Sequence, residues 1–383
     1  MFGAESLPGF LPSLFWGIIT ISFLVFVHEA GHFLAARILG LRVTEFFIGL
    51  PGPRISFKRG DTTYGITAIP LGGWVRVPAL EGSGPGAELG TMNPEEQAEH
   101  DSVPAWKRVT VLLSGVIANL VLAIVILTAL FTYTGIPIDK IDPVPGGPAA
   151  IAGIPDDSEI VEIDGSRIRH FGMLSDIIAK HQPGDEVAVT YVSAQGIKNT
   201  VNVTLEPRTI PEELAVDEQG NPLTQEQLEE LLAELPPAQM GVIRTAISYE
   251  RVGLLPAFGY SFTYIQLTAE GISRLFVPTT FVQAIGDATS VIGISVFAAH
   301  TASAGFVSFV TFIALISIAL GLMNLLPIPP LDGGKILFEI IQKITGKPVP
   351  QGFQIGISMF GFGILIVLMV YLMGQDLFRI FTG

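Results

Sequence analysis

The stretch LPSLFWGIITISFLVFVHEAGHFLAA at residues 11–36 decides the fold. It is an apolar run long enough to cross the bilayer core as one helix, which takes about 20 residues. Near its end it carries three ionisable side chains, His28, Glu29 and His32. Such groups cost free energy inside a membrane span and usually have a function there. We therefore expect a membrane protein with its chemistry near the end of its first span.

The composition of the whole chain agrees with a membrane protein. Hydrophobic residues make up 49% of the 383 residues and charged residues 15%, with a mean hydropathy of +0.55, which is too apolar for an ordinary soluble domain. Further apolar runs at 109–134, 305–326 and 354–374 predict a polytopic α-helical protein with about four transmembrane helices. The first run lacks the basic start and cleavage site of a signal peptide, so we expect it to be retained.

The formal charge of −14 limits the partners and ligands. An acidic balance argues against nucleic acid as a partner, because phosphate binding needs a basic surface. Almost all of the net charge falls within residues 139–250, which predicts a solvated segment between membrane spans. The chain has no cysteine, so a disulfide or a thiolate metal site is excluded and a metal would need His, Asp or Glu.

Basic side chains in two loops predict the orientation. They are Arg37, Arg42, Lys107 and Arg108 around the first long loop, and Lys335, Lys343 and Lys347 between the third and fourth apolar runs. Cytoplasmic loops carry the excess of Lys and Arg, so both loops should face the cytoplasm and the acidic stretch should be extracytoplasmic. The first and third spans then run in the same direction and end at the same membrane face.

Four segments follow from these patterns. Residues 1–138 form an N-terminal membrane part, 139–207 an α/β module, 208–253 an acidic linker, and 254–383 a C-terminal membrane part. The module should hold a strand near 159–165, a helix over 171–181 and strands at 186–192 and 199–207. Residues 254–276 are spaced for a helix on the membrane surface or for an ordinary packing helix. The run 291–326 is too long for one span and should break at 300–305.

The sequence HEAGH at residues 28–32 predicts a metal site. His28 and His32, four residues apart, share one face of a helix and can reach one ion, while Glu29 can act as a general base on a water. Incidental histidines at a helix end emerging into water are the alternative. Catalytic zinc takes three protein ligands, and Asp332 in NLLPIPPLDGG (324–334) is the best third candidate. Glu339 is a weaker candidate, and an exposed Asp in a Pro/Gly-rich loop is the alternative for Asp332.

These motifs, together with GVIAN at 115–119 and a module of PDZ type, resemble the bacterial site-2 protease family of regulated intramembrane zinc metalloproteases. The resemblance implies Zn²⁺ held by His28, His32 and Asp332, with Glu29 as the catalytic base. It also implies contacts to the substrate backbone; the matching residues are Asn324, Asn119 and Gly115. From the residues alone, Gly115 and Asn119 are equally a helix-packing pair.

The same resemblance predicts partners and location. Substrates would be single-span membrane proteins, such as anti-sigma factors or signal-peptide remnants, in the bacterial cytoplasmic membrane, with the active site towards the cytoplasm. Residues 54–77 should form a β-hairpin around Gly60 and Asp61, either cytoplasmic or dipping into the membrane to pair with an unwound substrate. The PDZ-like module lacks the usual Gly-hydrophobic-Gly-hydrophobic loop, which leaves a docking or size-filtering role.

Two other functions stay open at this point. One is a membrane-bound zinc protease that cuts soluble or extracted peptides, and the other is a non-enzymatic adaptor that recruits partners through the PDZ-like module. Four histidines lie outside every motif, and we expect them to be ordinary surface or loop residues: His100, His170, His181 and His300.

Overall fold

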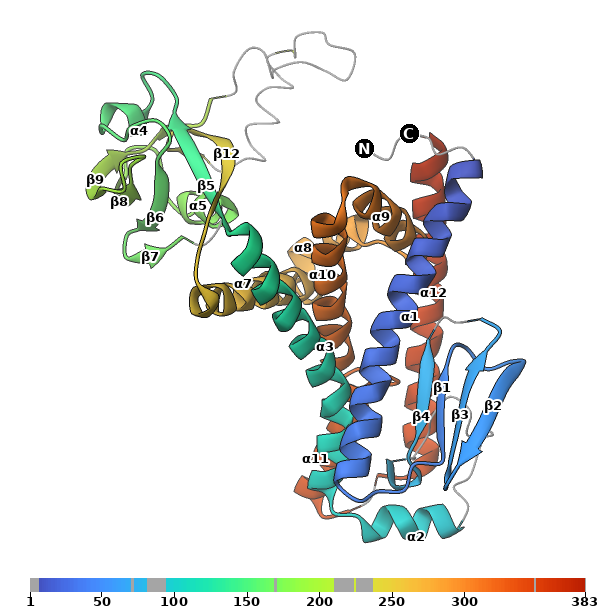
Figure 1. The fold of residues 1–383 in the computed structure, drawn as a ribbon. Coiled ribbons are helices and arrows are strands. Elements are labelled where there is room, and N and C mark those ends of the chain that lie inside the picture. The colour runs from blue at the N-terminus through green and yellow to red at the C-terminus, as the bar shows by residue number, and fades with distance from the viewer. Residues whose placement is uncertain are drawn as a thin grey trace. The chain divides into compact units, whose positions relative to one another are not determined.

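The computed structural model describes residues 7–69, 72–80, 94–168, 171–209, 224, 237–347 and 349–382. The chain forms two compact units. We call residues 1–130 with 254–383 the helical unit, and residues 131–253 the α/β unit (Figure 1).

Among the described residues of the helical unit, four helices are long and apolar enough to cross a membrane, with candidate spans at Ser13–Ile38, Ala105–Thr134, Phe306–Leu325 and Gly352–Arg379. They belong to α1 (Leu7–Ile38), α3 (Ala105–Thr134), α10 (Phe306–Leu325) and α12 (Gln351–Thr382). The four predicted spans are therefore confirmed to within a few residues.

Shorter helices connect the spans. They are α2 (Pro94–Ser102), α7 (Leu254–Ser273), α8 (Pro278–Asp287), α9 (Val291–Ala304) and α11 (Asp332–Thr345). The predicted helix after residue 254 is confirmed as α7, whereas its place on a membrane surface stays a prediction. The predicted break within 291–326 is confirmed. It lies at Gly305, which has a φ of 120° and separates α9 from α10. Helices α8 and α9 meet at a bend of 61° and could together form a fifth span.

The start of α9 is held by a buried carboxylate from α12. Oδ2 of Asp376 accepts hydrogen bonds from the backbone N and the Oγ of Ser290, at 2.7 and 2.6 Å, and from the backbone N of Gly293 at 3.2 Å. Asp376 is only 2% exposed. A buried carboxylate is tolerated because these donors replace its hydration.

A four-stranded sheet lies beside the C-terminal half of α1 (Figure 1). Its strands are β1 (Glu45–Ile48), β2 (Arg54–Arg59), β3 (Thr62–Thr67) and β4 (Gly73–Arg76), in the order β2-β3-β1-β4. The predicted hairpin is confirmed as β2 and β3, which pair antiparallel around Gly60 at a φ of 63°. The expected two-stranded arrangement was too simple, because β1 inserts between β3 and β4.

The α/β unit has its own hydrophobic core. The sheet β7-β6-β8-β9 is formed by β6 (Glu159–Ile163), β7 (Ser166–Arg167), β8 (Glu186–Val192) and β9 (Lys198–Thr204). The unit also contains the helices α4 (Pro148–Ile151) and α5 (Phe171–Ile178). The predicted helix and strands are present, with buried Ile163, Val187 and Val189 among the core residues.

Residues on both sides of 139–207 belong to the same unit. Strand β5 (Ile136–Pro143) pairs with β12 (Val242–Glu250), and β10 (Glu206–Pro207) pairs with β11 (Ala238–Gln239). The unit is thus wider than the module expected from the sequence, because its first strand finds its partner about a hundred residues later. Most of the expected linker 208–253, including the helix expected after Thr224, lies outside the described residues.

Candidate metal centre

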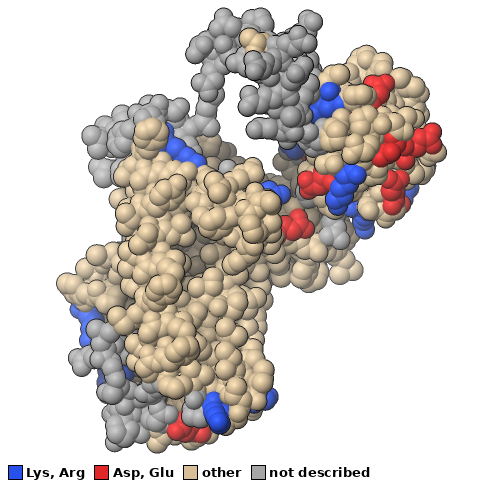
Figure 2. Space-filling view, turned by 180° about the vertical axis from the view of Figure 1, so that it is seen from behind, with Lys and Arg blue, Asp and Glu red and all other residues tan. Residues whose placement is uncertain are grey.

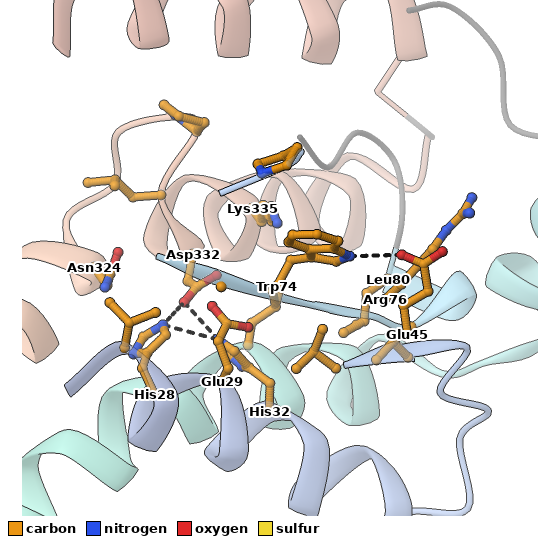
Figure 3. A pocket seen from close by; sticks show the side chains of 18 of the residues that line it. His28, Glu29, His32, Glu45, Trp74, Arg76, Leu80, Asn324, Asp332 and Lys335 are labelled. Carbon is orange, nitrogen blue, oxygen red and sulfur yellow. Dashed lines mark hydrogen bonds and ion pairs between the residues drawn. The ribbon is translucent and has the colours of Figure 1, made fainter. Parts of the chain in front are cut away.

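Three side chains from two distant helices meet beside the end of α1 (Figure 3). His28 and His32 lie on one face of α1 with their Nε2 atoms 3.1 Å apart. Oδ2 of Asp332, the first residue of α11, lies 3.0 Å from Nε2 of His28 and 3.2 Å from Nε2 of His32. The structure therefore brings together the three residues that the sequence predicted as metal ligands.

The geometry of these donors fits a small tetrahedral cation. Ligand bonds of about 2.0–2.1 Å in a zinc site separate the ligand atoms by roughly 3.3 Å, close to the three separations observed. The donor set of two imidazoles and one carboxylate is one that zinc accepts, and three ligands leave a fourth position for water or substrate. The side chains are 7%, 10% and 13% exposed, so the group is nearly dry but still reachable.

Close packing by glycine places Asp332 against α1. A Cβ added at Gly333 would lie 2.2 Å from the carbonyl oxygen of Leu325, and one at Gly334 would lie 2.5 Å from the backbone N of Pro329. Only glycine lets the start of α11 fold back so tightly onto the end of α10. The Pro/Gly-rich segment after α10 is therefore a turn that aims Asp332 at the two histidines, and it is not an open loop.

A cavity of about 520 Å³ opens onto the three donors. Glu29 lines it together with Asn324, whereas neither Gly115 nor Asn119 is among its described lining residues. Strand β4 forms another wall, and a Cβ added at Gly73 would lie 3.2 Å from Cγ of Glu29. The cavity can thus admit a peptide segment next to a carboxylate and a metal site.

Sequence reasoning missed several residues of this cavity. Trp74 lines it, stacks on Phe47 with ring centroids 4.7 Å apart, and donates from Nε1 to Oε2 of Glu45 at 2.8 Å. Lys335 lies one turn beyond Asp332 and also lines the cavity (Figure 3). The run GGW at 72–74 was a signal that could have found this wall, because glycine pairs mark close backbone approach.

Glu339, the weaker ligand candidate, is engaged elsewhere. Its Oε1 and Oε2 accept from Nε and Nη2 of Arg108 on α3, at 2.8 and 2.7 Å. His100 was expected to be an ordinary surface residue, and this is wrong: its Nε2 lies 3.7 Å from Oε1 of Glu339 and its side chain is only 15% exposed. Burial raises the pKa of Glu339, but hydrogen bonds from His100 and Arg108 outweigh it, so the pKa lies below its ordinary value.

The remaining histidines take no part in the metal centre. His181 lies in the α/β unit, where its Nε2 is 3.4 Å from Oδ2 of Asp164. His300 lies on α9 and is exposed. His170 lies outside the described residues.

Comparisons with known proteins identify the family of this chain. The model of peptidase family M50 matches residues 16–368. A candidate zinc metalloprotease of Mesorhizobium japonicum is 30% identical over 379 residues, which cover 96% of this chain and 99% of that protein. The protein named regulator of sigma-W protease RasP of Bacillus subtilis is 27% identical over 443 residues, covering 95% of this chain and 98% of its own.

Among solved structures, a match covers a small part of the chain. The solution structure of GtR34C from Geobacillus thermodenitrificans covers 19% of this chain and 80% of its own at 24% identity, with a TM-score of 0.17, which is too low to support an argument about the fold. The family match spans nearly the whole chain and includes all three clustered donors. The chain therefore belongs to peptidase family M50 and is a zinc metalloprotease of the membrane.

Proposed function

We propose that this protease hydrolyses peptide bonds in or beside the transmembrane helices of other membrane proteins. One observation carries the proposal: His28, Glu29 and His32 lie inside the candidate span Ser13–Ile38, and the cavity that reaches them lies among helices and the β4 strand. A peptide bond must come between membrane helices to reach such a site. A site built for soluble peptides would have no reason to bury its donors in a span.

The proposed roles follow from the geometry of the donors. His28, His32 and Asp332 would hold the zinc ion, and the chemistry it would supply there is that of a Lewis acid, which activates water and polarises a carbonyl group. Glu29 follows His28 in the chain and lines the same cavity, so its carboxylate can take the proton of the attacking water. It then passes that proton to the leaving amine.

Strand β4 offers a place for the substrate backbone. It is the last strand in the sheet order, and its residues Gly73, Trp74, Val75 and Arg76 line the cavity. A peptide bond in a helix is shielded, so the substrate must unwind before attack. An unwound segment could pair with β4 and replace its lost helical hydrogen bonds. Asn324, which also lines the cavity, is suited to hold a substrate peptide group with its amide.

We assign the substrates to single-span membrane proteins, of the anti-sigma-factor type or remnants of signal peptides. A relative whose name is regulator of sigma-W protease supports this class. The basic loops support a location in the bacterial cytoplasmic membrane with the metal centre towards the cytoplasm, because cytoplasmic loops carry the excess of Lys and Arg. The α/β unit, which we propose to be a PDZ-like module, would then be extracytoplasmic and act as a docking module or size filter.

The test uses the full chain purified in detergent and reconstituted into liposomes with a labelled single-span substrate. We expect Glu29→Gln to abolish cleavage while the zinc content stays at one ion per chain, because the amide cannot accept the proton. Glu186→Gln, the same change at the exposed first residue of β8, should cleave as the parent does. Cleavage by Glu29→Gln would refute the assignment of the base. If the parent enzyme cut a soluble peptide but never the membrane-embedded substrate, the intramembrane function would be wrong.

A further inference from the structure

Helix α3 presents three residues at four-residue spacing to the two histidines of α1. Val111, Gly115 and Asn119 share one face of α3, just as His28 and His32 share one face of α1. The carbonyl oxygen of Val111 accepts from Nδ1 of His32 at 2.7 Å. A Cβ added at Gly115 would lie 2.5 Å from Nε2 of His32, so glycine there makes room for the imidazoles.

Asn119 occupies the position opposite His28. Its side chain is completely buried, and its Nδ2 lies 3.5 Å from Nδ1 of His28. Its Oδ1 has no hydrogen-bond partner anywhere in the described part of the chain. A buried amide oxygen without a partner costs free energy, and such atoms in native proteins call for an explanation.

The chemistry of a metal-bound imidazole supplies that explanation. Nε2 of His28 points at Asp332 and His32 (Figure 3). When Nε2 holds a metal, Nδ1 carries the proton and needs an acceptor. The two ends of an amide have nearly the same shape, so a half-turn of the Asn119 amide brings Oδ1 to the place of Nδ2. One rotation satisfies both the orphaned oxygen and the Nδ1 proton.

We propose that Asn119 is a positioning residue for zinc, with Oδ1 accepting a hydrogen bond from Nδ1 of His28. This bond fixes the tautomer and the ring orientation of the first ligand, as the carbonyl of Val111 does for His32. Helix α3 then supplies the outer support for both histidines of α1. The inference rests on the proposed ligand role of His28, and it gives Asn119 a different task from contact with substrate.

The test compares zinc affinity in two Asn119 variants of the detergent-purified full chain, measured by competition with a chelator in the absence of substrate. Asn119→Leu keeps the volume but removes the acceptor, so zinc affinity should fall about 10–100-fold. Asn119→Asp keeps an oxygen acceptor, and its zinc affinity should stay within a few-fold of the parent's or rise. Thr110→Val, on the exposed side of α3, should leave zinc affinity unchanged.

If Asn119 instead contacts the substrate, the opposite pattern of zinc affinities is expected. Zinc affinity would then be the same in the parent and in Asn119→Leu, and KM would rise in both Asn119 variants; this result overturns the inference. A fall in zinc affinity shared equally by Asn119→Leu and Asn119→Asp would overturn it as well, because the acceptor would not matter. His28→Ala separates the two proposals: if it keeps the parent's zinc affinity, the ligand set itself is wrong.

Discussion

The two units of this chain place polar and apolar residues in opposite ways. In the helical unit, Arg108, Glu339 and Asp376 are buried with partners, while Phe15, Val125 and many other large apolar side chains are exposed. In the α/β unit the core is apolar and charged side chains are dense on the surface (Figure 2). The surface of the helical unit suits lipid, and the surface of the α/β unit suits water.

This difference indicates in which unit ion pairs contribute most to the stability of the fold. Arg108 and Glu339 form a two-point pair between α3 and α11, and Nη1 of Arg108 also donates to the carbonyl oxygen of His100 at 2.8 Å. Glu339 lies two helical turns after Asp332, and Arg108 two turns before Gly115. The pair therefore ties α11, which carries Asp332, to α3, which contacts the two histidines of α1. In the α/β unit, the pair of Arg244 and Asp139 is longer, at 3.5 Å, and partly exposed.

The largest expected effect is on stability, when each of these two ion pairs is broken in a separate variant. Arg108→Ala removes both close hydrogen bonds of the buried Glu339 carboxylate and leaves it only the longer contact with His100. This should lower the free energy of unfolding of the helical unit by about 3–5 kcal/mol. Arg244→Ala removes a partly exposed pair and should cost at most about 1 kcal/mol. Unfolding of the full chain in detergent, followed by circular dichroism, measures both. Equal losses in the two variants would show that burial does not separate the two regions.

Apolar truncations should reverse the contrast. Ile163→Ala in the α/β unit removes a fully buried side chain from the core and should cost about 2–5 kcal/mol. Val125→Ala on α3 shortens a side chain that is 60% exposed and should change the free energy of unfolding by less than about 0.5 kcal/mol in detergent. The measurement is the unfolding midpoint of each unit. A large loss from Val125→Ala would mean that this face of α3 packs against protein.

Much of the site could be predicted from local sequence. His28, Glu29 and His32 stand on one helix, so their spacing alone predicts their common face, and the direction of the spans brings Asp332 to them. What failed depends on contacts between distant segments. Nothing near Glu45 announces that β1 inserts between β3 and β4, and nothing near Ile136 announces a partner strand beginning at Val242. The pairing of Arg108 with Glu339 spans 231 residues, and Lys335 lines the cavity only because α11 begins at Asp332.

The smallest expected effect is a difference in the sign of pH dependence between two carboxyl groups. Hydrogen bonds from His100 and Arg108 outweigh burial and hold the pKa of Glu339 below its ordinary value, whereas burial raises the pKa of Glu159 in the α/β unit. A lowered pKa stabilises the folded state above the unfolded pKa, and this stabilisation is lost as pH falls through the folded pKa. A raised pKa acts in the opposite direction, because the folded state then holds its proton more tightly.

We therefore expect two variants to differ from the parent in opposite directions at pH 7, and both differences to shrink when the unfolding midpoint is followed down to about pH 3. Glu339→Gln should be less stable than the parent at pH 7. This gap should narrow only below the ordinary carboxyl pKa of 4.5, where the unfolded parent binds a proton more readily than the folded parent does. Glu159→Gln should be slightly more stable than the parent at pH 7, because the ionised carboxylate no longer has to be buried, and this gain should also shrink on acidification. If both substitutions raised or both lowered the stability at pH 7, the prediction would be wrong. The hydrogen bonds of Glu339 with Arg108 and His100 would then not explain the difference between the two carboxyl groups.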